Sequence, residues 1–435
     1  MQQRGAWTQH HLAAAAISAI FSVMLAALVA FSLGCAAQSS LDNAPGAAAS
    51  AHPAPPRVYS LRADALERAK QRIHGGGASM TAYERLVGEA DAALQAGPFS
   101  VMDKHRVPPS GDRHDYVSMG PYWWPDSSKP NGLPYIRRDG ERNPEIASDY
   151  DAPRFGALTG AVTTLSLAYY FTDDEKYAAR AALLLRVWFL DPATRMHPHL
   201  RYGQRIPGIT EGRAAGIIET RRLVDIVDAI GMLERSPAWT DADARGMRAW
   251  MAAYREWLLT SQIGKDEQRA RNNHGSWYDA QVAALALFTG DTALARSTIE
   301  ASKTRRIATQ VTPDGRQPYE LARTRSLGYS VMNLEALCRL AELGRHVGVD
   351  LWSYESPGGG SIRKALDYVA PYADTTRKWP GLEIARNAPD FLVLMLERAR
   401  IAYGDEYGDL LRKIPRDLVL SHRAQLLYPD PNPAP

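Results

Sequence analysis

Cysteine is nearly absent from this 435-residue chain, which contains only Cys35 and Cys338. Two cysteines cannot form the disulfide framework that stabilises small secreted domains. Cys35 lies in or beside an N-terminal leader. Cys338 falls in a helical apolar pattern, so we expect it to be an inert core residue. The chain must therefore be stabilised by a large hydrophobic core, for which it is long enough.

A large excess of charge is also missing, because 51 Lys and Arg face 48 Asp and Glu, a formal net charge of +3. This balance argues against nucleic acid as a partner. Motifs for metals, nucleotides and serine nucleophiles are absent as well. The histidine-bearing tripeptides HPH (197–199) and HDY (114–116) lack the spaced ligand set of a zinc site. We therefore expect no metal and no cofactor.

Alternating strand patterns are not evident, whereas helical periodicity is common. Leu158, Val162, Leu165 and Tyr169 are spaced four, three and four residues apart, and a similar stripe from residue 247 to 257 follows a predicted cap at Thr240. The pattern predicts an all-α fold of antiparallel helical hairpins. Closing such hairpins into a ring would give an (α/α) toroid, an incomplete α/α barrel, although periodicity alone does not show the ring.

The N-terminus predicts export. Arg4 precedes an uncharged run over 12–33 that is long enough to span a bilayer, but its small-residue ending favours a cleaved signal over 1–37. Cleavage after Ala37 would release a periplasmic or secreted protein. The sequence SLGC resembles a lipobox, which would make Cys35 the lipid anchor of an outer-membrane lipoprotein and its sole membrane contact. We expect a flexible Ala/Pro/Ser linker over 38–57, one domain over 58–425 and a loose tail over 426–435.

A long segment over about 97–150 does not fit the helical pattern and is rich in aromatic and basic residues. Its rings either bind the apolar faces of sugars or cover the top of the core, and its cations would pair with carboxylates. The candidates for substrate binding in this loop are Lys104, His114, Tyr116, Trp123 and Trp124.

The stretch RNNHGSWYDA (271–280) places two asparagines beside a histidine. Asparagine is a good helix cap, so one interpretation is a cap for a helix that begins near Ser276. The other is that Asn273 and His274 point into a cleft.

Three motifs in this order, GDRHDYVSMGPYWWPD, NNHGSWYD and PDGRQPYELARTRSLGYS, resemble the alginate-lyase superfamily of polysaccharide lyases. The resemblance covers roughly residues 95–400. It includes the polymannuronate lyases and, more closely, their relatives that act on glucuronan and alginate. The segment 198–220 also matches, with Gln204, Gly208, Arg213 and Glu219 in corresponding places. His197 and His199 stand where we expect asparagines, which either alters a subsite or has no effect.

The resemblance implies an α/α toroid that cleaves a uronic-acid polymer by β-elimination and leaves unsaturated uronate ends. Asn273 and His274 would neutralise the uronate carboxylate, with His274 as the base when the C5 hydrogen and O4 lie on opposite faces. Tyr329 would be the acid toward O4, and the base when they lie on the same face. Arg323, or its neighbour Arg325, would lower the pKa of Tyr329 or bind the carboxylate.

Further residues have weaker assignments. We expect Gln204, Arg213 and Tyr278 to contribute to substrate binding, and Tyr319 and Glu320 to support Arg323. Two alternatives stay open: a glycoside hydrolase, which needs two carboxylates, and a non-catalytic protein that binds glycans. The carboxylates available to a hydrolase are Asp115, Asp126, Glu219 and Asp279.

Overall fold

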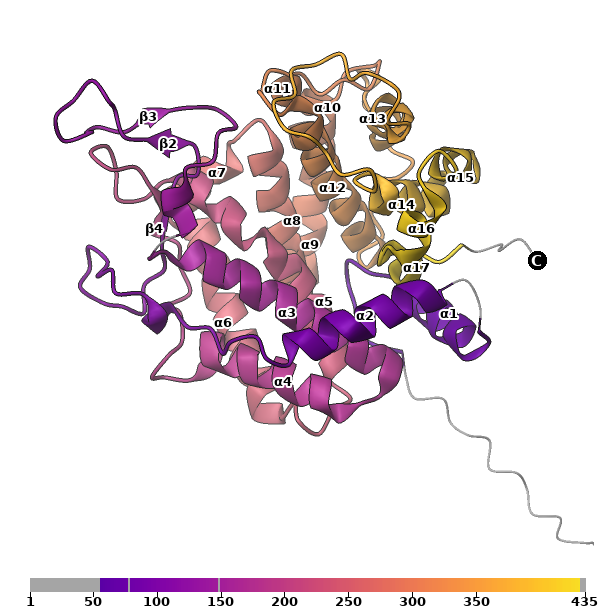
Figure 1. The fold of residues 1–435 in the computed structure, drawn as a ribbon, viewed down its shortest axis with the longest axis horizontal. Coiled ribbons are helices and arrows are strands. Elements are labelled where there is room, and N and C mark those ends of the chain that lie inside the picture. The colour runs from indigo at the N-terminus through magenta and orange to yellow at the C-terminus, as the bar shows by residue number, and fades with distance from the viewer. Residues whose placement is uncertain (1–54, 77–78, 148, 431–435) are drawn as a thin grey trace, which may run out of the picture. The chain divides into compact units, whose positions relative to one another are not determined.

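The computed structural model describes residues 55–76, 79–147 and 149–430, most of which are helical (Figure 1). The described residues form one compact unit. The predicted export signal, including Cys35, and most of the predicted linker lie outside the described residues. No helix in the described part of the chain has the length and apolar character needed to cross a membrane.

Five helices build the N-terminal half of the unit: α1 (Ala63–His74), α2 (Met80–Ala93), α3 (Asp151–Thr172), α4 (Glu175–Leu185) and α5 (Leu223–Leu233). α3 contacts α2, α4 and α5. The predicted stripe Leu158, Val162 and Leu165 is fully buried on α3. The spacing of these residues therefore marks the face on which α3 packs.

A second group comprises α6 (Asp241–Thr260), α7 (Gln262–Gln268), α8 (Asn273–Phe288) and α9 (Thr292–Ser302). The cap predicted at Thr240 is present, since Asp243 N donates to Thr240 Oγ1 and Thr240 N donates to Asp243 Oδ2. α8 contacts α5, α6, α7, α9 and α12 (Ser326–Arg345). Every residue of α8 except His274 is buried.

The C-terminal part contains α12 and several shorter helices. These are α10 (Ala308–Gln310), α11 (Pro318–Leu321), α13 (Ile362–Val369), α14 (Val393–Tyr403), α15 (Glu406–Leu411), α16 (Arg416–Ser421) and α17 (Ala424–Leu427). Short 3-10 or π turns lie between the helices: η1 (Val101–Asp103), η2 (Pro144–Ala147), η3 (Arg186–Leu190), η4 (Ala214–Arg222), η5 (Lys303–Ile307) and η6 (Ala370–Ala373).

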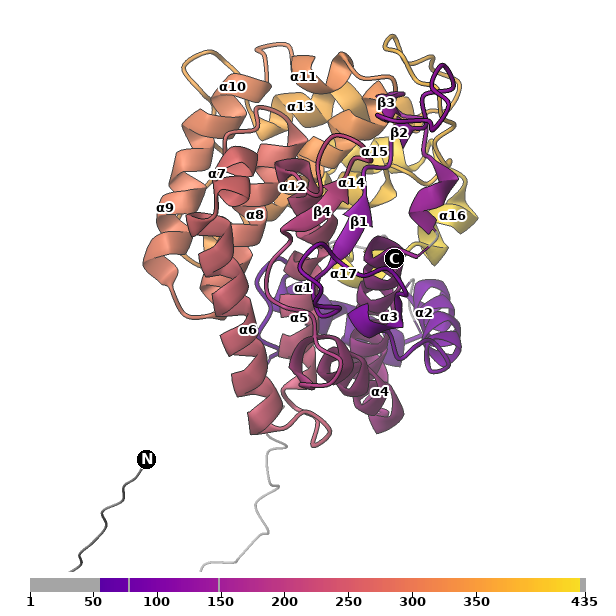
Figure 2. The same cartoon turned by 90° about the vertical axis from the view of Figure 1, so that its left-hand side faces the viewer.

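The long aromatic segment over about 97–150 contributes three strands to two small strand pairs. β1 (Val117–Met119) is parallel to β4 (Tyr202–Arg205), and β2 (Trp123–Trp124) is antiparallel to β3 (Ile136–Arg137). The β2–β3 pair, α10 and α11 lie toward the same end of the fold in both views (Figures 1 and 2). The predicted all-α class is confirmed, whereas closure of the helices into a toroid stays a prediction.

Both predicted boundaries of the domain are wrong by a few residues. Leu426 and Tyr428 are buried, and Arg398 Nε donates to Tyr428 Oη over 3.0 Å, so the chain is packed to residue 430 rather than loose from 426. At the other end, Arg57 forms an ion pair with Glu234, so the predicted linker 38–57 is already packed at its last residue. The apolar residues Leu426 and Tyr428 and the charged residue Arg57 pack against the domain, and this explains both differences.

The N-terminal segment crosses α5 at Gly231. A Cβ at Gly231 would lie 1.8 Å from the carbonyl oxygen of Arg57, so a larger residue would push this segment away. We expect Gly231→Ala to destabilise the fold by about 1–3 kcal/mol, as overpacking does. The matched control is Gly156→Ala in α3, where a Cβ meets nothing within 4 Å. That control should be neutral or stabilising by up to about 1 kcal/mol. Denaturant unfolding of both variants checks the prediction, and equal stabilities would contradict it.

Candidate active site

The start of α8 is held by a buried carboxylate. Asn272 is the N-cap and Asn273 is the first helical residue, so the cap lies three to four residues before the position predicted near Ser276. Asn273 donates twice to Glu320 of α11, from its backbone N to Oε1 over 2.6 Å and from Nδ2 to Oε2 over 2.7 Å. A carboxylate here also complements the positive end of the helix dipole. Asn273 is only 1% exposed, so it positions the start of α8. The interpretation that Asn273 points into a cleft is therefore wrong.

His274 follows directly and is oriented by a second carboxylate. Its Nδ1 lies 2.6 Å from Oε1 of Glu267 on α7. A carboxylate at Nδ1 favours the tautomer with the proton on that nitrogen and leaves Nε2 as an acceptor. Among the described residues, no partner of Nε2 is found, and the side chain is 21% exposed. The imidazole is therefore prepared to accept a proton from a ligand.

Tyr329 and Arg323 lie on the neighbouring elements α12 and the turn after α11. The Arg323 guanidinium carbon lies 3.9 Å from the centre of the Tyr329 ring. Tyr329 Oη donates to Tyr122 Oη over 2.5 Å. Tyr122 belongs to the long aromatic segment over about 97–150, called the aromatic loop from here on. Burial and this hydrogen bond raise the pKa of Tyr329, although Arg323 acts to lower it. Arg323 therefore acts on the pKa of Tyr329 in the predicted direction, but burial and the contact with Tyr122 outweigh it, and the phenol keeps its proton.

Arg323 is itself fixed by the aromatic loop. Its Nη2 and Nε donate to Asp139, with Nη2 to Oδ1 at 2.7 Å and Nε at 3.1 Å from both oxygens. Thr324 N also donates to Asp139 Oδ2. Burial acts to raise the pKa of Asp139, but the bonds from Arg323 and Thr324 outweigh it and lower that pKa well below its usual range. The loop is therefore held to the turn before α12 by an ionised carboxylate.

The four predicted catalytic residues are connected in two steps: Glu320 interacts with Asn273, His274 and Arg323, and Arg323 lies over the Tyr329 ring. Burial raises the pKa of Glu320, and electrostatic interactions with Arg323 and His274 oppose that rise. Both side chains therefore lie within electrostatic range of the carboxylate that holds Asn273. Glu267 and Asp139 were missed by the sequence analysis. The partner of Asp139 is 184 residues away, and although Glu267 is only seven residues from His274, the turn between α7 and α8 that brings them together has no sequence signal we recognised.

Part of the predicted sugar-binding set also gathers near the aromatic loop. Arg213 lies over the Trp123 ring, 5.9 Å from its centre, and its Nη2 donates to Gln204 Oε1 over 2.6 Å. Trp124 is partly exposed, and its Nε1 donates to the Glu141 carbonyl. Trp123 and Arg213 are also partly exposed, so an aromatic face and a cation are accessible side by side.

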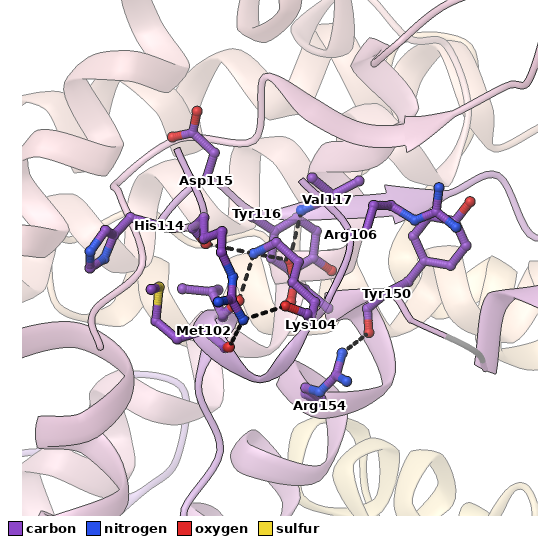
Figure 3. A network of polar contacts seen from close by, with 12 residues as sticks. Met102, Lys104, Arg106, His114, Asp115, Tyr116, Val117, Tyr150 and Arg154 are labelled. Atoms are coloured by element: carbon purple, nitrogen blue, oxygen red, sulfur yellow. Dashed lines mark hydrogen bonds and ion pairs between the residues drawn. The ribbon is translucent and has the colours of Figure 1, made fainter. Parts of the chain in front are cut away.

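Lys104 is not a binding residue. It is fully buried, and its Nζ donates to the carbonyls of Val101 and Arg113 over 2.7 Å and lies 3.1 Å from Asp151 Oδ2. Figure 3 shows its ammonium group within this network. Burial raises the pKa of Asp151 to about 6 and lowers that of Lys104, while the attraction between the two charges opposes both shifts. The pair joins the loop to the start of α3.

Two tyrosines are also buried rather than exposed to a ligand. Tyr116 is fully buried, and its hydroxyl donates to Glu219 over 2.8 Å. Burial raises the pKa of Glu219 to about 6, although hydrogen bonds from Ser118 and Tyr116 oppose this rise. Tyr278 is 1% exposed and donates to the Leu258 carbonyl. The prediction that Tyr116 and Tyr278 contact substrate is therefore wrong, since both aromatic side chains belong to the core.

His114 lies apart from these groups, within another cluster. Its Nδ1 is 2.6 Å from the Arg195 carbonyl, and its ring centre is 5.4 Å from that of His197. Among the described residues, Asp115, His197 and His199 form the one group of ligand atoms close enough to hold a metal ion, all within 4.8 Å of one another. The sequence analysis missed this grouping because Asp115 lies about 80 residues from the two histidines.

Comparison with known proteins identifies the class. Residues 100–379 match the alginate lyase family. A crystal structure of an alginate lyase from Bacteroides ovatus superimposes with a TM-score of 0.82 and 41% identity, covering 86% of this chain and 99% of that one. Alginate lyase A1-III from Sphingomonas species A1 is 18% identical, with a TM-score of 0.56 and coverage of 86% and 96%, and shares the fold. A comparison with curated proteins gives no match.

The chain therefore belongs to the alginate lyase family. It is a polysaccharide lyase, as the order of its three motifs predicted.

Glu267 should matter through the tautomer of His274. In Glu267→Gln, the amide can donate to Nδ1 and shift the proton to Nε2, where it blocks proton abstraction. We expect kcat to fall by about 100-fold, with KM and the melting temperature little changed. The control is Asp266→Asn on the exposed side of α7, where Asp266 pairs with Arg269. Steady-state kinetics of both variants check this, and wild-type kcat in Glu267→Gln would exclude a proton-transfer role for His274.

Lys104→Met should act on stability alone. The substitution leaves Asp151 buried without its counter-charge, which costs about 3–5 kcal/mol. KM for the polymer should stay unchanged at temperatures where the variant is folded. The control is Lys129→Met, at an exposed position of the same loop. Unfolding curves and KM of both variants check the prediction, and a raised KM with unchanged stability would restore Lys104 as a binding residue.

Proposed function

We propose that this protein cleaves a uronic-acid polymer by β-elimination and leaves an unsaturated uronate at the new end. The observation that supports this most is the pairing of an oriented imidazole, His274, with a protonated phenol, Tyr329, on adjacent elements. β-Elimination needs one group to take the C5 proton and another to protonate O4. It adds no water and therefore needs no pair of catalytic carboxylates.

His274 Nε2 takes the C5 proton in this proposal. Glu267 keeps the ring proton on Nδ1 and stabilises the imidazolium that forms. The electron pair of the broken C5–H bond becomes the C4–C5 double bond as the C4–O4 bond breaks. Charge that develops on the uronate carboxylate must be stabilised during this step. Arg323, which lies over the Tyr329 ring, is the cation we assign to this task.

Tyr329 supplies the proton to O4. Its raised pKa keeps the phenol protonated, which suits an acid and disfavours the same group as a base in the resting state. Once the proton has left, the guanidinium of Arg323 at 3.9 Å from the ring centre stabilises the phenolate. A polymer whose C5 hydrogen and O4 lie on opposite faces would fit this division between His274 and Tyr329.

The polymer itself would be held by the aromatic loop. Trp123 presents a ring beside the Arg213 guanidinium, a pairing suited to one sugar face and one carboxylate. The Sphingomonas enzyme is known in complex with a tetrasaccharide, and the Bacteroides relative is an alginate lyase. We therefore propose alginate as the first substrate to test and glucuronan as the second.

A glycoside hydrolase is the weaker alternative. Of the carboxylates it would use, Asp279 is fully buried and paired with Arg306 at 2.8 Å. Asp115 contacts two histidines, and Asp126 accepts hydrogen bonds from Ser128. These partners give each carboxylate a structural role. A purely glycan-binding protein would not need His274 and Tyr329 to be oriented in this way.

We also propose that the protein acts outside the cytoplasm, as a periplasmic or secreted enzyme or as a lipoprotein anchored at Cys35. The proposal rests on the apolar leader and its small-residue ending. An exported lyase would meet its polymer without transport of the substrate.

Tyr329→Phe tests the chemistry directly. We expect the variant to keep its fold and lose activity by about 10²- to 10⁴-fold, because the proton donor to O4 is gone. The control is Tyr83→Phe, in α2, which removes a hydroxyl far along the chain from the site. Ultraviolet absorbance of the unsaturated product is followed with polymannuronate, polyguluronate, glucuronan and a neutral glucan.

A signal on one uronan, lost in Tyr329→Phe and kept in Tyr83→Phe, would support the proposal and name the substrate. New reducing ends without ultraviolet absorbance would instead indicate hydrolysis. Binding without cleavage would exclude the proposed role of Tyr329.

A further inference from the structure

Three potential metal ligands converge where the aromatic loop meets the segment before β4. His197 Nδ1 lies 2.9 Å from Asp115 Oδ1, and His199 Nε2 lies 3.1 Å from the same oxygen. All three ligand atoms lie within 4.8 Å of one another. Ligands at about 2.0–2.2 Å from zinc lie roughly 3.3–3.5 Å apart in a tetrahedron, so only small movements would admit an ion.

The three side chains are open to solvent on the histidine side, and the carboxylate of Asp115 is held by a hydrogen bond. The side chains of His197 and His199 are 39% and 19% exposed, whereas that of Asp115 is 6% exposed. Ser110 Oγ donates to the second carboxylate oxygen, Asp115 Oδ2, over 2.6 Å. In Figure 3 the Asp115 side chain points away from the buried network around Lys104. An ion could therefore enter from solvent and find one ligand already oriented, as metal sites require.

We propose that Asp115, His197 and His199 form a binding site for one divalent transition-metal ion of the zinc type. Two imidazoles and one carboxylate suit zinc and its neighbours, whereas magnesium and calcium prefer oxygen ligands alone. Three protein ligands leave at least one position for water or for a ligand oxygen. This site is separate from the proton-transfer pair and does not depend on the proposed reaction.

The hydrogen bonds of His199 leave one of its ring nitrogens directed at the cluster. Arg201 N donates to His199 Nδ1 over 3.4 Å, which places the ring proton on Nε2. Binding through Nε2 would move that proton to Nδ1 and cost one long, weak hydrogen bond.

The ion would join two segments that are distant in the sequence. Asp115 is two residues before β1, and His199 is three residues before β4, the strand that pairs with β1. A metal bridge at this point would fix the β1–β4 pair and, through β4, the backbone of Gln204. His199 also lies beside Trp257 of α6, with ring centres 6.2 Å apart. An ion bound to His199 would therefore also restrain the contact with α6.

The test uses the untagged protein, because a histidine tag would bind the same ions. After treatment with a chelator, the protein is dialysed against Zn²⁺, and Co²⁺ is added separately to follow its visible absorption. We expect one Zn²⁺ per chain, a Co²⁺ spectrum of low coordination number, and a melting temperature that rises with Zn²⁺ but not with Ca²⁺.

The variants are His197→Asn, His199→Asn and the double variant, with His105→Asn as the control at an exposed position of the same loop. Each single substitution should weaken Zn²⁺ binding by at least about tenfold, and the double variant should bind none. His105→Asn should bind as the wild type does. Absence of Zn²⁺ binding in the wild type, or equal loss in His105→Asn, would overturn the proposal. If the double variant does not fold, the Zn²⁺-dependent and chelator-reversible rise in wild-type melting temperature decides.

Discussion

The burial of α8 is the constraint on which the site depends. A helix enclosed on all sides must satisfy its N-terminal groups from neighbouring elements, because water cannot reach them. Glu320 meets this need at the backbone N of Asn273, and Glu267 bonds the side chain of the next residue, His274. His274 is the one residue of α8 that is not buried. The same packing that stabilises the core therefore leaves a single imidazole at the surface and holds it in one orientation.

The aromatic loop is attached to this frame at three separate points. Lys104 and Asp151 join its beginning to α3, Tyr122 meets Tyr329, and Asp139 holds Arg323. The second contact is made by Tyr329 itself and the third by Arg323, which lies over the Tyr329 ring. The orientation of Tyr329 therefore depends on the position of the loop.

The sequence predicted the helical class, because helical periodicity is a local signal, while the roles of His274 and Tyr329 stay a prediction. Leu158, Val162 and Leu165 are buried as their spacing required, and the motifs around His274 and Tyr329 are contiguous. Predictions failed where a binding role was assigned from residue type alone, because residue type does not show which way a side chain points. Lys104, Tyr116 and Tyr278 have the chemistry of sugar-binding residues, yet all three point into the core. Their orientation depends on partners elsewhere in the chain: Asp151, Glu219 and the Leu258 carbonyl. The contact between Asp139 and Arg323 was missed for the same reason.

The isolated thiol of Cys338 gives the folded domain an internal reporter. The side chain is fully buried on α12, its Sγ lies 3.7 Å from the sulfur of Met395 on α14, and burial raises its pKa to about 12. Alkylating reagents attack the thiolate, which is scarce at neutral pH in this environment. The rate at which such a reagent modifies Cys338 therefore measures how often α12 and α14 separate, without any engineered label.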